Sequence, residues 1–572
     1  MNAIVVAALG LVAYALAYRF YARFLAEKIF RLDPDFVTPA HELEDGTDFV
    51  PTNKHVLWGH HFTSIAGAAP IVGPAIAVFW GWLPALLWVI FGTIFFAGVH
   101  DFATLWISAR HKARSMGSLT EDVISGRSRT LFLVVIFLLL LMVNAVFAVI
   151  IARLFVHFPG SVLPVWISLP IAMLVGWWIY RRGGRLFWPS IGALTALYFF
   201  IWVGSRVPIS LPASTLGLEP AAVWVVLLFV YCFFASRLPV WLLLQPRDYV
   251  NSHELIVGLG VLYLGLLVGA PAMVAPAWNP APAGAPPVVP ILFITIACGA
   301  ISGFHGLVAS GTSSKQLDEE TDARFVGYMG AVGEGALALG SILVVTAGLA
   351  ATRGEWLSHY YTDWKAASGG AAHYFVLGLA HMAGNLGIPE GLGEVFATVI
   401  VVSFAATTMD TGIRLQRYIL HEVGETWRIR PLASPTLATA LAVGSCMVLA
   451  FGAHGPGGGV GSGGLVIWPL FGTTNQLLAA LSLIVVSVYL RRLGRNVVPT
   501  VVPLVFVLVM TIWAMLTSLG TWWLGETPNH LLGVLGLLVL GAAIWMTLEA
   551  VAALRAPESP GAPGRARERT RP

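Results

Sequence analysis

The chain has 572 residues, of which 57% are hydrophobic and only 11% are charged. Soluble domains carry roughly 25% charged residues, so this composition indicates a membrane protein with many spans and argues against soluble enzymes and nucleic-acid-binding proteins. The formal net charge of +4 is better explained by orientation in a membrane than by an anionic partner.

Apolar runs of about 20 residues, separated by charged or Gly/Pro-rich breaks, predict helices that span the membrane. In chain order the fifteen predicted spans are 3–20, 62–81, 84–107, 130–154, 162–180, 187–204, 221–244, 255–274, 290–310, 325–350, 391–409, 435–451, 465–490, 498–519 and 531–553. The first run continues into Arg19 without a cleavage site for a signal peptidase, so we expect a retained span.

Basic residues gather in every second loop, as they do on the cytoplasmic side of membrane proteins. With the N-terminus outside and the C-terminus inside, all but five of the 33 Lys and Arg residues fall in inner segments. The exceptions are Arg153, Arg206, Arg237, Arg353 and Lys365. A missed span would disrupt this alternation of basic and non-basic loops. The alternation therefore favours an odd number of spans.

Two longer segments lie outside the spans. The aromatic loop from Ala351 to Glu390 is predicted to be an external cap with a short interfacial helix. The tail at 555–572 is rich in Pro, Arg and Glu, which predicts a disordered cytoplasmic segment.

Two predicted spans are interrupted by helix-breaking residues, and such spans line substrate paths in transporters. The second predicted span of the chain, 62–81, follows His60 and His61 and contains Gly67, Pro70 and Gly73. The seventh contains Ser236, Arg237 and Pro239.

These two spans lie five apart and cross in opposite senses, which is the signature of an inverted repeat. We therefore predict two pseudo-symmetric halves, 59–204 (spans two to six) and 205–410 (spans seven to eleven). Residues 1–58 would add one span and a cytoplasmic loop, and residues 411–554 would add the last four spans.

Several long motifs make the chain resemble a known family. They are the run from Asn53 to Phe62, its continuation to Pro74, Gln245 to Tyr249, and Ser302 to His305 with the Gly-Thr that follows. Together they resemble the carbon starvation protein A (CstA) family of bacterial transporters. The resemblance implies an inner-membrane secondary transporter with an amino acid/polyamine/organocation (APC, LeuT-like) fold. It also implies uptake of peptides or pyruvate when carbon is scarce, with proton coupling.

Substrate contacts are expected at the two interrupted spans. His60 and His61 stand at the inner start of the second span and suit a carboxylate contact or proton coupling. Arg237 is interpreted as the one basic residue well within a span, where it could clamp a carboxylate. Alternatively, Arg237 could pair with Glu334 as scaffold, and the histidines could be packing residues.

Coupling is assigned to a second set of polar residues. His100 and Asp101 lie within the third predicted span, where an unpaired carboxylate would be costly, and could form a proton relay or a structural pair. His305, Thr312 and Ser313 belong to the ninth span and could complete that relay or coordinate Na⁺ as the alternative coupling ion. Helix-packing hydrogen bonds are the competing role for the hydroxyls.

A resident metal or organic cofactor is not expected. The three cysteines, Cys232, Cys298 and Cys446, lie in apolar runs and are interpreted as packing residues. A metal cluster is chemically conceivable, but its members have no metal-binding spacing such as HExxH. They would be His60, His61, His100, Asp101 and His305.

Alternating-access transport of a small solute is thus the leading hypothesis, with no covalent chemistry. A membrane sensor that keeps a transporter fold is the rival hypothesis, although the inner loops are too short to hold an output domain. The sequence does not distinguish peptide from pyruvate, nor does it indicate an oligomeric state.

Overall fold

The computed structural model describes residues 1–555 apart from 47, 183–186, 240, 283, 427 and 454–465. Every regular element of that part is a helix, accompanied by three isolated β-bridges. A helix satisfies its backbone hydrogen bonds within one segment, as a lipid environment requires. The predicted all-helical class is therefore confirmed. The predicted tail beyond residue 555 and the glycine-rich run from Gly455 to Gly464 lie outside the described residues.

Twelve helices in the described ranges are long and apolar enough to cross a membrane. They are α1 to η2 (Ala3–Phe30), α6 to α7 (Trp82–Arg110), α9 (Gly126–His157), α10 (Val162–Arg182), α11 (Phe187–Arg206), α13 (Leu244–Gly269), η7 to α16 (Glu320–Ala347), α19 (Glu390–Thr426), α20 (Pro435–Gly452), α22 (Trp468–Arg492), α23 (Val498–Leu524) and α24 (His530–Arg555). A bent pair, α4 (Lys54–Ile65) and α5 (Ala69–Ala77), makes a thirteenth candidate.

Two further predicted spans are short or interrupted. Helix α12 covers only Pro220–Ala235, and the ninth predicted span consists of α14 (Val288–Thr295) and α15 (Gly303–Gly311). Each predicted span thus has a helical counterpart. The number of crossings, fifteen, stays a prediction, because length and composition alone support twelve or thirteen.

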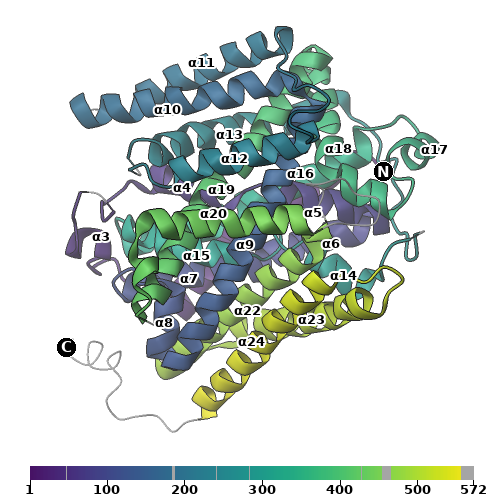
Figure 1. Ribbon diagram of the computed structural model, residues 1–572. Helices are drawn as coiled ribbons and strands as arrows, with labels where there is room; N and C mark the ends of the chain where they lie inside the picture. Colours follow the sequence, from purple (N-terminus) through teal and green to yellow (C-terminus); the bar gives the residue numbers. More distant parts are fainter. Residues whose placement is uncertain are drawn as a thin grey trace.

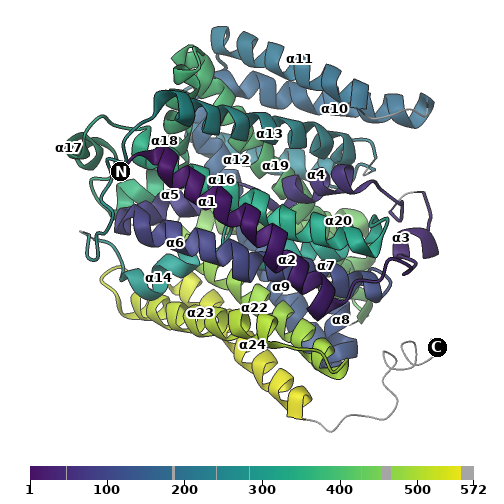
Figure 2. The same ribbon diagram turned by 180° about the vertical axis from the view of Figure 1, so that it is seen from behind.

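The helices form a bundle with a buried centre and a lipid-facing rim. Four candidate spans are between 89% and 94% buried in their most apolar window, namely those of α9, α16, α19 and α22, whereas several others are only 33–39% buried. Figure 1 shows the α10–α11 hairpin at one edge and α23 and α24 at the opposite edge. Figure 2, seen from behind, shows α1 lying across the outside of the bundle. Apolar side chains exposed on the rim helices suit contact with lipid.

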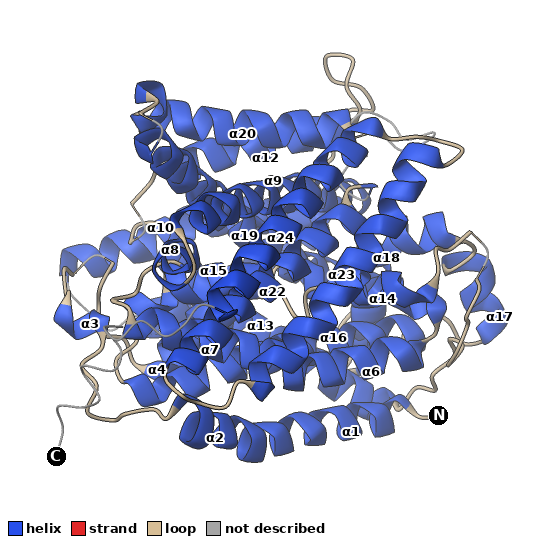
Figure 3. Ribbon diagram, turned by 90° about the horizontal axis from the view of Figure 1, so that it is seen from below, coloured by secondary structure: helices blue, strands red, loops and turns tan. Residues whose placement is uncertain are grey.

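One end of the bundle, which we call the N face, carries the start of the chain and the predicted cap (Figure 3). The cap contains α17 (Arg353–Glu355), the π-helical turn η9 (Trp356–Tyr360) and α18 (Trp364–Asn385). The Tyr361 hydroxyl donates to the Ala75 carbonyl at 2.8 Å. The cap is therefore fastened to the second half of the bent pair.

The opposite end, the C face, carries α3 (Pro39–Glu42), α8 (Met116–Val123) and a segment that we call the C-face strap, residues 31–46 and 48–53. The strap is tied by ion pairs to the segment that precedes α16. The His41 imidazole lies 2.8 Å from the Asp318 carboxylate, and the buried Glu320 carboxylate accepts from both the Asp33 backbone N–H at 2.7 Å and the Arg110 guanidinium. The strap thus covers the end of the bundle at this face.

Candidate functional site

The bent pair α4–α5 confirms the predicted interruption of the second span. The two helices are bent by 52° at residues 66–68, all of which are buried. A Cβ at Gly67 would lie 2.9 Å from the Phe147 ring and 3.0 Å from Thr408 Oγ1. A Cβ at Gly73 would lie only 2.4 Å from the Thr295 carbonyl oxygen. These two positions therefore require glycine for close packing rather than for a special backbone angle.

The second interruption lies in α14–α15 and not in the predicted seventh span. Residues 296–302 between these helices are non-helical and wholly buried. This segment packs against the start of α5, directly after the first interruption, because a Cβ at Gly299 would lie 3.6 Å from Pro70 Cβ. Irregular backbone at this depth is tolerated only inside protein or along a cavity. The two interruptions together mark the centre of the candidate site.

The expectation that Arg237 lies well within a span is wrong. Helix α12 ends at Ala235, two residues earlier, and Arg237 is exposed with its guanidinium 5.8 Å from the Phe233 ring centroid. Ser236 is buried, but its hydroxyl donates at 3.3 Å to the Phe233 carbonyl in its own chain segment. Glu334 does not pair with Arg237 either, because its carboxylate contacts His305.

A buried network joins three of the predicted coupling residues. Asp101 of α7 (Gly98–Arg110) accepts from His100 Nδ1 and from His305 Nδ1, each at 2.8 Å. His305 of α15 also reaches the Glu334 carboxylate of α16 with Nε2 at 3.2 Å. All four side chains are 0% exposed. One imidazole thus bridges two carboxylates that belong to different helices.

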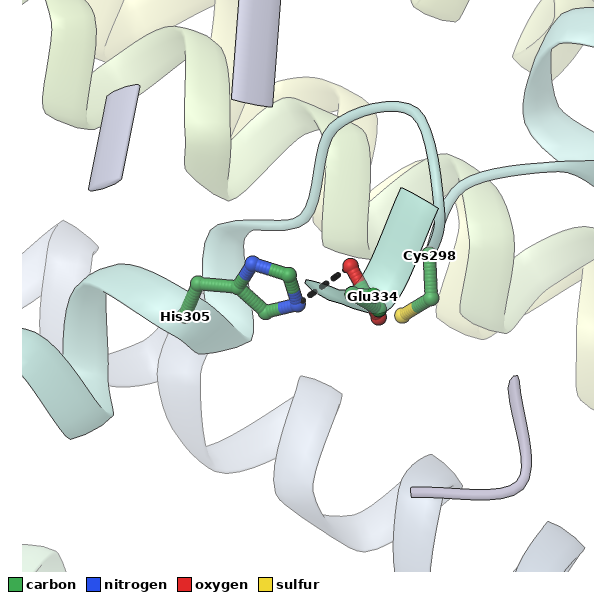
Figure 4. A group of neighbouring side chains, drawn as sticks. All are labelled: Cys298, His305 and Glu334. Atoms are coloured by element: carbon green, nitrogen blue, oxygen red, sulfur yellow. Dashed lines mark ion pairs between the residues drawn. The ribbon is translucent and has the colours of Figure 1, made fainter. Parts of the chain in front are cut away.

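Cys298 lies beside this network in the interrupted segment (Figure 4). Its sulfur, His305 Nε2 and a Glu334 carboxylate oxygen lie within 4.8 Å of one another, which is close enough to share a cation. His305 and Glu334 already pair with each other, and Asn475 Nδ2 donates to the sulfur at 3.3 Å. We therefore interpret the group as an ion pair with a packed thiol.

The remaining predicted coupling residues lie toward the C face. His61 Nδ1 and the Ser313 hydroxyl share a hydrogen bond of 2.8 Å, and both residues are buried. Thr312 follows the end of α15, and its backbone N–H donates to the Val308 carbonyl at 3.0 Å. His61 and Ser313 therefore join α4 to the end of α15, next to the bridged network.

His60 belongs to a different cluster, which adjoins the first interruption. Its Nδ1 lies 3.0 Å from Asp248 Oδ2 on α13, and the Ser64 hydroxyl donates to the same carboxylate oxygen at 3.5 Å. Asp248 is 1% exposed. The conceivable metal cluster, which was not expected, is not formed as a unit by its five residues, since His60 and His61 have partners of their own.

A buried arginine of the site is Arg247, which lies in α13, the helix that follows α12. Its guanidinium pairs with Asp410 of α19 and donates to the Tyr231 hydroxyl of α12 at 2.8 Å. The Tyr231 hydroxyl in turn donates to Asp410 at 2.5 Å. Arg247 and Asp248 are both buried within the bundle.

Sequence reasoning did not single out Asp410, Thr407 or Thr408. The Thr407 hydroxyl accepts from the Asn251 amide at 2.9 Å, and Thr408 faces Gly67. The sequence did contain one signal for Asp410, namely a lone carboxylate at the edge of an apolar run. The predicted span ended one residue before it, whereas α19 continues to Thr426. Asn475 and Gln476 of α22 reach neighbouring segments through bonds to Ser302 and to the Phe293 carbonyl, respectively.

Comparison with known proteins identifies relatives over most of the chain. The family model described as carbon starvation protein CstA matches residues 2–355 and 351–514. The peptide transporter CstA of Campylobacter jejuni subsp. jejuni is 34% identical over 90% of this chain and 80% of its own length. The pyruvate/proton symporter BtsT of Escherichia coli K12 is 32% identical over 88% of this chain and 80% of its own length. Among solved structures, MhsT in complex with L-phenylalanine aligns with a TM-score of 0.44 and 13% identity over 87% of this chain and 99% of its own.

Proposed function

Since the chain belongs to the carbon starvation protein CstA family, and is thus a multi-pass membrane transporter and not an enzyme, we propose that it imports small carboxylates, either peptides or pyruvate, by proton-coupled alternating access. The observation that carries this proposal is the contact between two interrupted helices beside a buried histidine–carboxylate network. We further propose that it acts in the bacterial inner membrane with the N face outside.

The substrate is proposed to bind where the two interrupted helices pack together. Helix α5 begins at Ala69 and directs its positive N-terminal end toward the first interruption, which suits a carboxylate. The C-terminal end of α4 directs carbonyl groups toward the same place, which suits the amine of a peptide. Among the predicted contacts, Gly67, Pro70 and Gly73 lie in this region, whereas Ser236 and Arg237 do not.

Coupling follows from the chemistry of an imidazole between two carboxylates. A protonated histidine has two N–H donors and can hold Asp101 and Glu334 at once, whereas a neutral histidine has only one. Loss of the proton would therefore release α15 from either α7 or α16. Because α15 follows directly from the second interruption, this release would change the shape of the substrate site.

Purified protein in proteoliposomes tests this function. Labelled pyruvate and a labelled dipeptide are offered with an inward proton gradient, an inward Na⁺ gradient and no gradient. Accumulation above equilibrium that requires the proton gradient and is abolished by a protonophore is the expected result. Accumulation driven only by Na⁺ would overturn the proton assignment.

If neither substrate accumulates under any gradient, in protein that is monodisperse by size-exclusion chromatography, the proposal that the chain imports these solutes is overturned. That outcome would favour the rival sensor function. A sensor would still bind its ligand, so a binding measurement on the same sample separates loss of transport from loss of recognition.

A further inference from the structure

A group of basic side chains at the N face has no part in the site described above. Arg153 and His157 lie one turn apart near the end of α9, and His373 lies on the cap helix α18. Arg153 is one of the few basic residues outside the predicted inner segments. A long basic side chain near the end of a span can place its charge at the membrane surface.

These side chains meet across the seam between α9 and α18. The guanidinium of Arg153 approaches within 4.0 Å of the position that a Cβ of Gly369 would take, and Gly369 is one turn before His373. The rings of His157 and His373 lie 4.9 Å apart between centroids, and Phe158 stacks on His373 at 5.0 Å. Three basic groups therefore line the same seam between α9 and α18.

The cluster is not neutralised by the protein. None of the described carboxylates forms an ion pair with Arg153, His157 or His373, and the Nδ1 atom of His373 is buried without a hydrogen-bond partner in the same part of the chain. Burial, with His157 alongside, lowers the pKa of His373 to about 4. At neutral pH the His373 ring is therefore an uncharged hydrogen-bonding group in the same seam as the Arg153 guanidinium.

We propose that Arg153, with His157 and His373, binds the carboxylate of an incoming solute at the N face before it reaches the central site. A guanidinium recognises a carboxylate with paired hydrogen bonds, and the imidazole nitrogens can add one more each. The proposal rests on the proposed function for the direction of travel, but binding itself does not. The ligand class is a small monocarboxylate or the C-terminus of a short peptide.

Equilibrium dialysis of labelled pyruvate against the full chain in a neutral detergent tests binding without transport. We expect two molecules bound per chain and only one in Arg153→Gln. The matched control is Arg206→Gln, because Arg206 is exposed at the end of α11, lies 5.7 Å from the Trp202 ring centroid, and should not change the stoichiometry. Unlabelled methyl pyruvate, which lacks the charge, should not compete.

Transport kinetics then distinguish binding at the N face, which affects KM, from the later transport step, which sets the maximal rate. In proteoliposomes, Arg153→Gln should raise KM for pyruvate about tenfold, as expected for loss of a charge-assisted hydrogen bond, with the maximal rate unchanged. His373→Gln should raise KM less, and it also serves if Arg153→Gln does not purify as a monodisperse species. Arg153→Lys should restore most of the affinity.

Three results would overturn the proposal. One is equal stoichiometry in Arg153→Gln and the parent chain. Another is competition by phosphatidylglycerol in mixed micelles but not by free carboxylates, which would assign the cluster to a lipid headgroup. A third is a lower maximal rate with unchanged KM. If instead two molecules bind and nothing is transported, the N-face site holds and the proposed function fails.

Discussion

Asp101 and His305 share a buried hydrogen bond of 2.8 Å although 204 positions separate them in the chain. The bond joins α7 to α15, and the second nitrogen of the same imidazole joins α15 to α16 through Glu334. A single side chain therefore holds three helices around the second interruption. Every variant that alters this imidazole changes both its proton capacity and its links to neighbouring helices.

Replacing His305 with Gln should uncouple transport from the proton gradient. Glutamine can donate to one carboxylate but cannot carry the proton, so gradient-driven accumulation should fall at least tenfold, roughly 1.4 kcal/mol in driving interaction, while exchange of labelled for unlabelled substrate continues. The control is His55→Gln, since His55 is exposed at the start of α4. Retention of full accumulation in His305→Gln would exclude this residue from coupling.

Arg237, just after α12, and Arg247, in α13, should respond differently to the same substitution. Arg247→Gln leaves the buried Asp410 carboxylate without its cation, which costs about 3–5 kcal/mol for a buried pair. Thermal unfolding in detergent should show a large drop in the midpoint. Arg237→Gln should leave the midpoint unchanged because that side chain is exposed. A double variant, Arg247→Gln with Asp410→Asn, should recover part of the loss.

The close packing of α5 against the end of α14 can be tested by adding one methyl group at Gly73. Gly73→Ala should destabilise the chain by about 1–3 kcal/mol through overpacking, because the new Cβ would lie 2.4 Å from the Thr295 carbonyl oxygen. Gly444→Ala in α20 meets nothing within 4 Å and should stabilise slightly, since alanine favours a helix by roughly 0.5–1 kcal/mol. Unfolding midpoints of both variants are compared in the same detergent. Equal midpoints would contradict the close contact.

Opening of the C-face strap should depend on Glu320. This carboxylate is 0% exposed and holds both Arg110 and the Asp33 backbone N–H. An Ala40→Cys reporter in α3 is buried in the closed strap, and the three native cysteines are buried as well. Glu320→Gln should therefore accelerate maleimide labelling of the reporter on the order of tenfold, through local opening.

The matched control for the strap is Glu27→Gln. Glu27 forms an exposed pair with Arg23 on the first span, and exposed pairs of this kind contribute little. Its labelling rate should equal that of the reporter alone. Rapid labelling of the reporter without any further substitution would contradict a closed strap.

Much of the fold could be predicted because a lipid environment imposes strong constraints. Apolar length identified the helices, and the break at Gly67 to Gly73 was predicted because its prolines and glycines disrupt the helical hydrogen-bond ladder. The break at residues 296–302 contains no proline, and its single glycine, Gly299, adopts a positive φ of +88°. Its composition resembles that of an ordinary packed helix.

The candidate site was predictable only in part, for a similar reason. His100, Asp101 and His305 stood out because ionisable residues are rare within spans. The identity of the buried arginine depends on where α12 ends. Because α12 ends a few residues earlier than predicted, Arg237 lies at the surface, whereas Arg247 in the next helix is buried. The partner of Arg247, Asp410, is 163 positions away, and such pairing is decided by tertiary packing rather than by local pattern.

The bridge from one imidazole to two carboxylates has a consequence for membrane voltage. Under the proposed coupling mechanism, one such imidazole would carry one proton per transport cycle. Pyruvate is a monoanion, so its import with one proton would move no net charge and would be unaffected by a valinomycin-imposed potential. A zwitterionic dipeptide with one proton would carry a positive charge inward, and an inside-negative potential would accelerate it. Voltage dependence therefore distinguishes the two substrates through their charge.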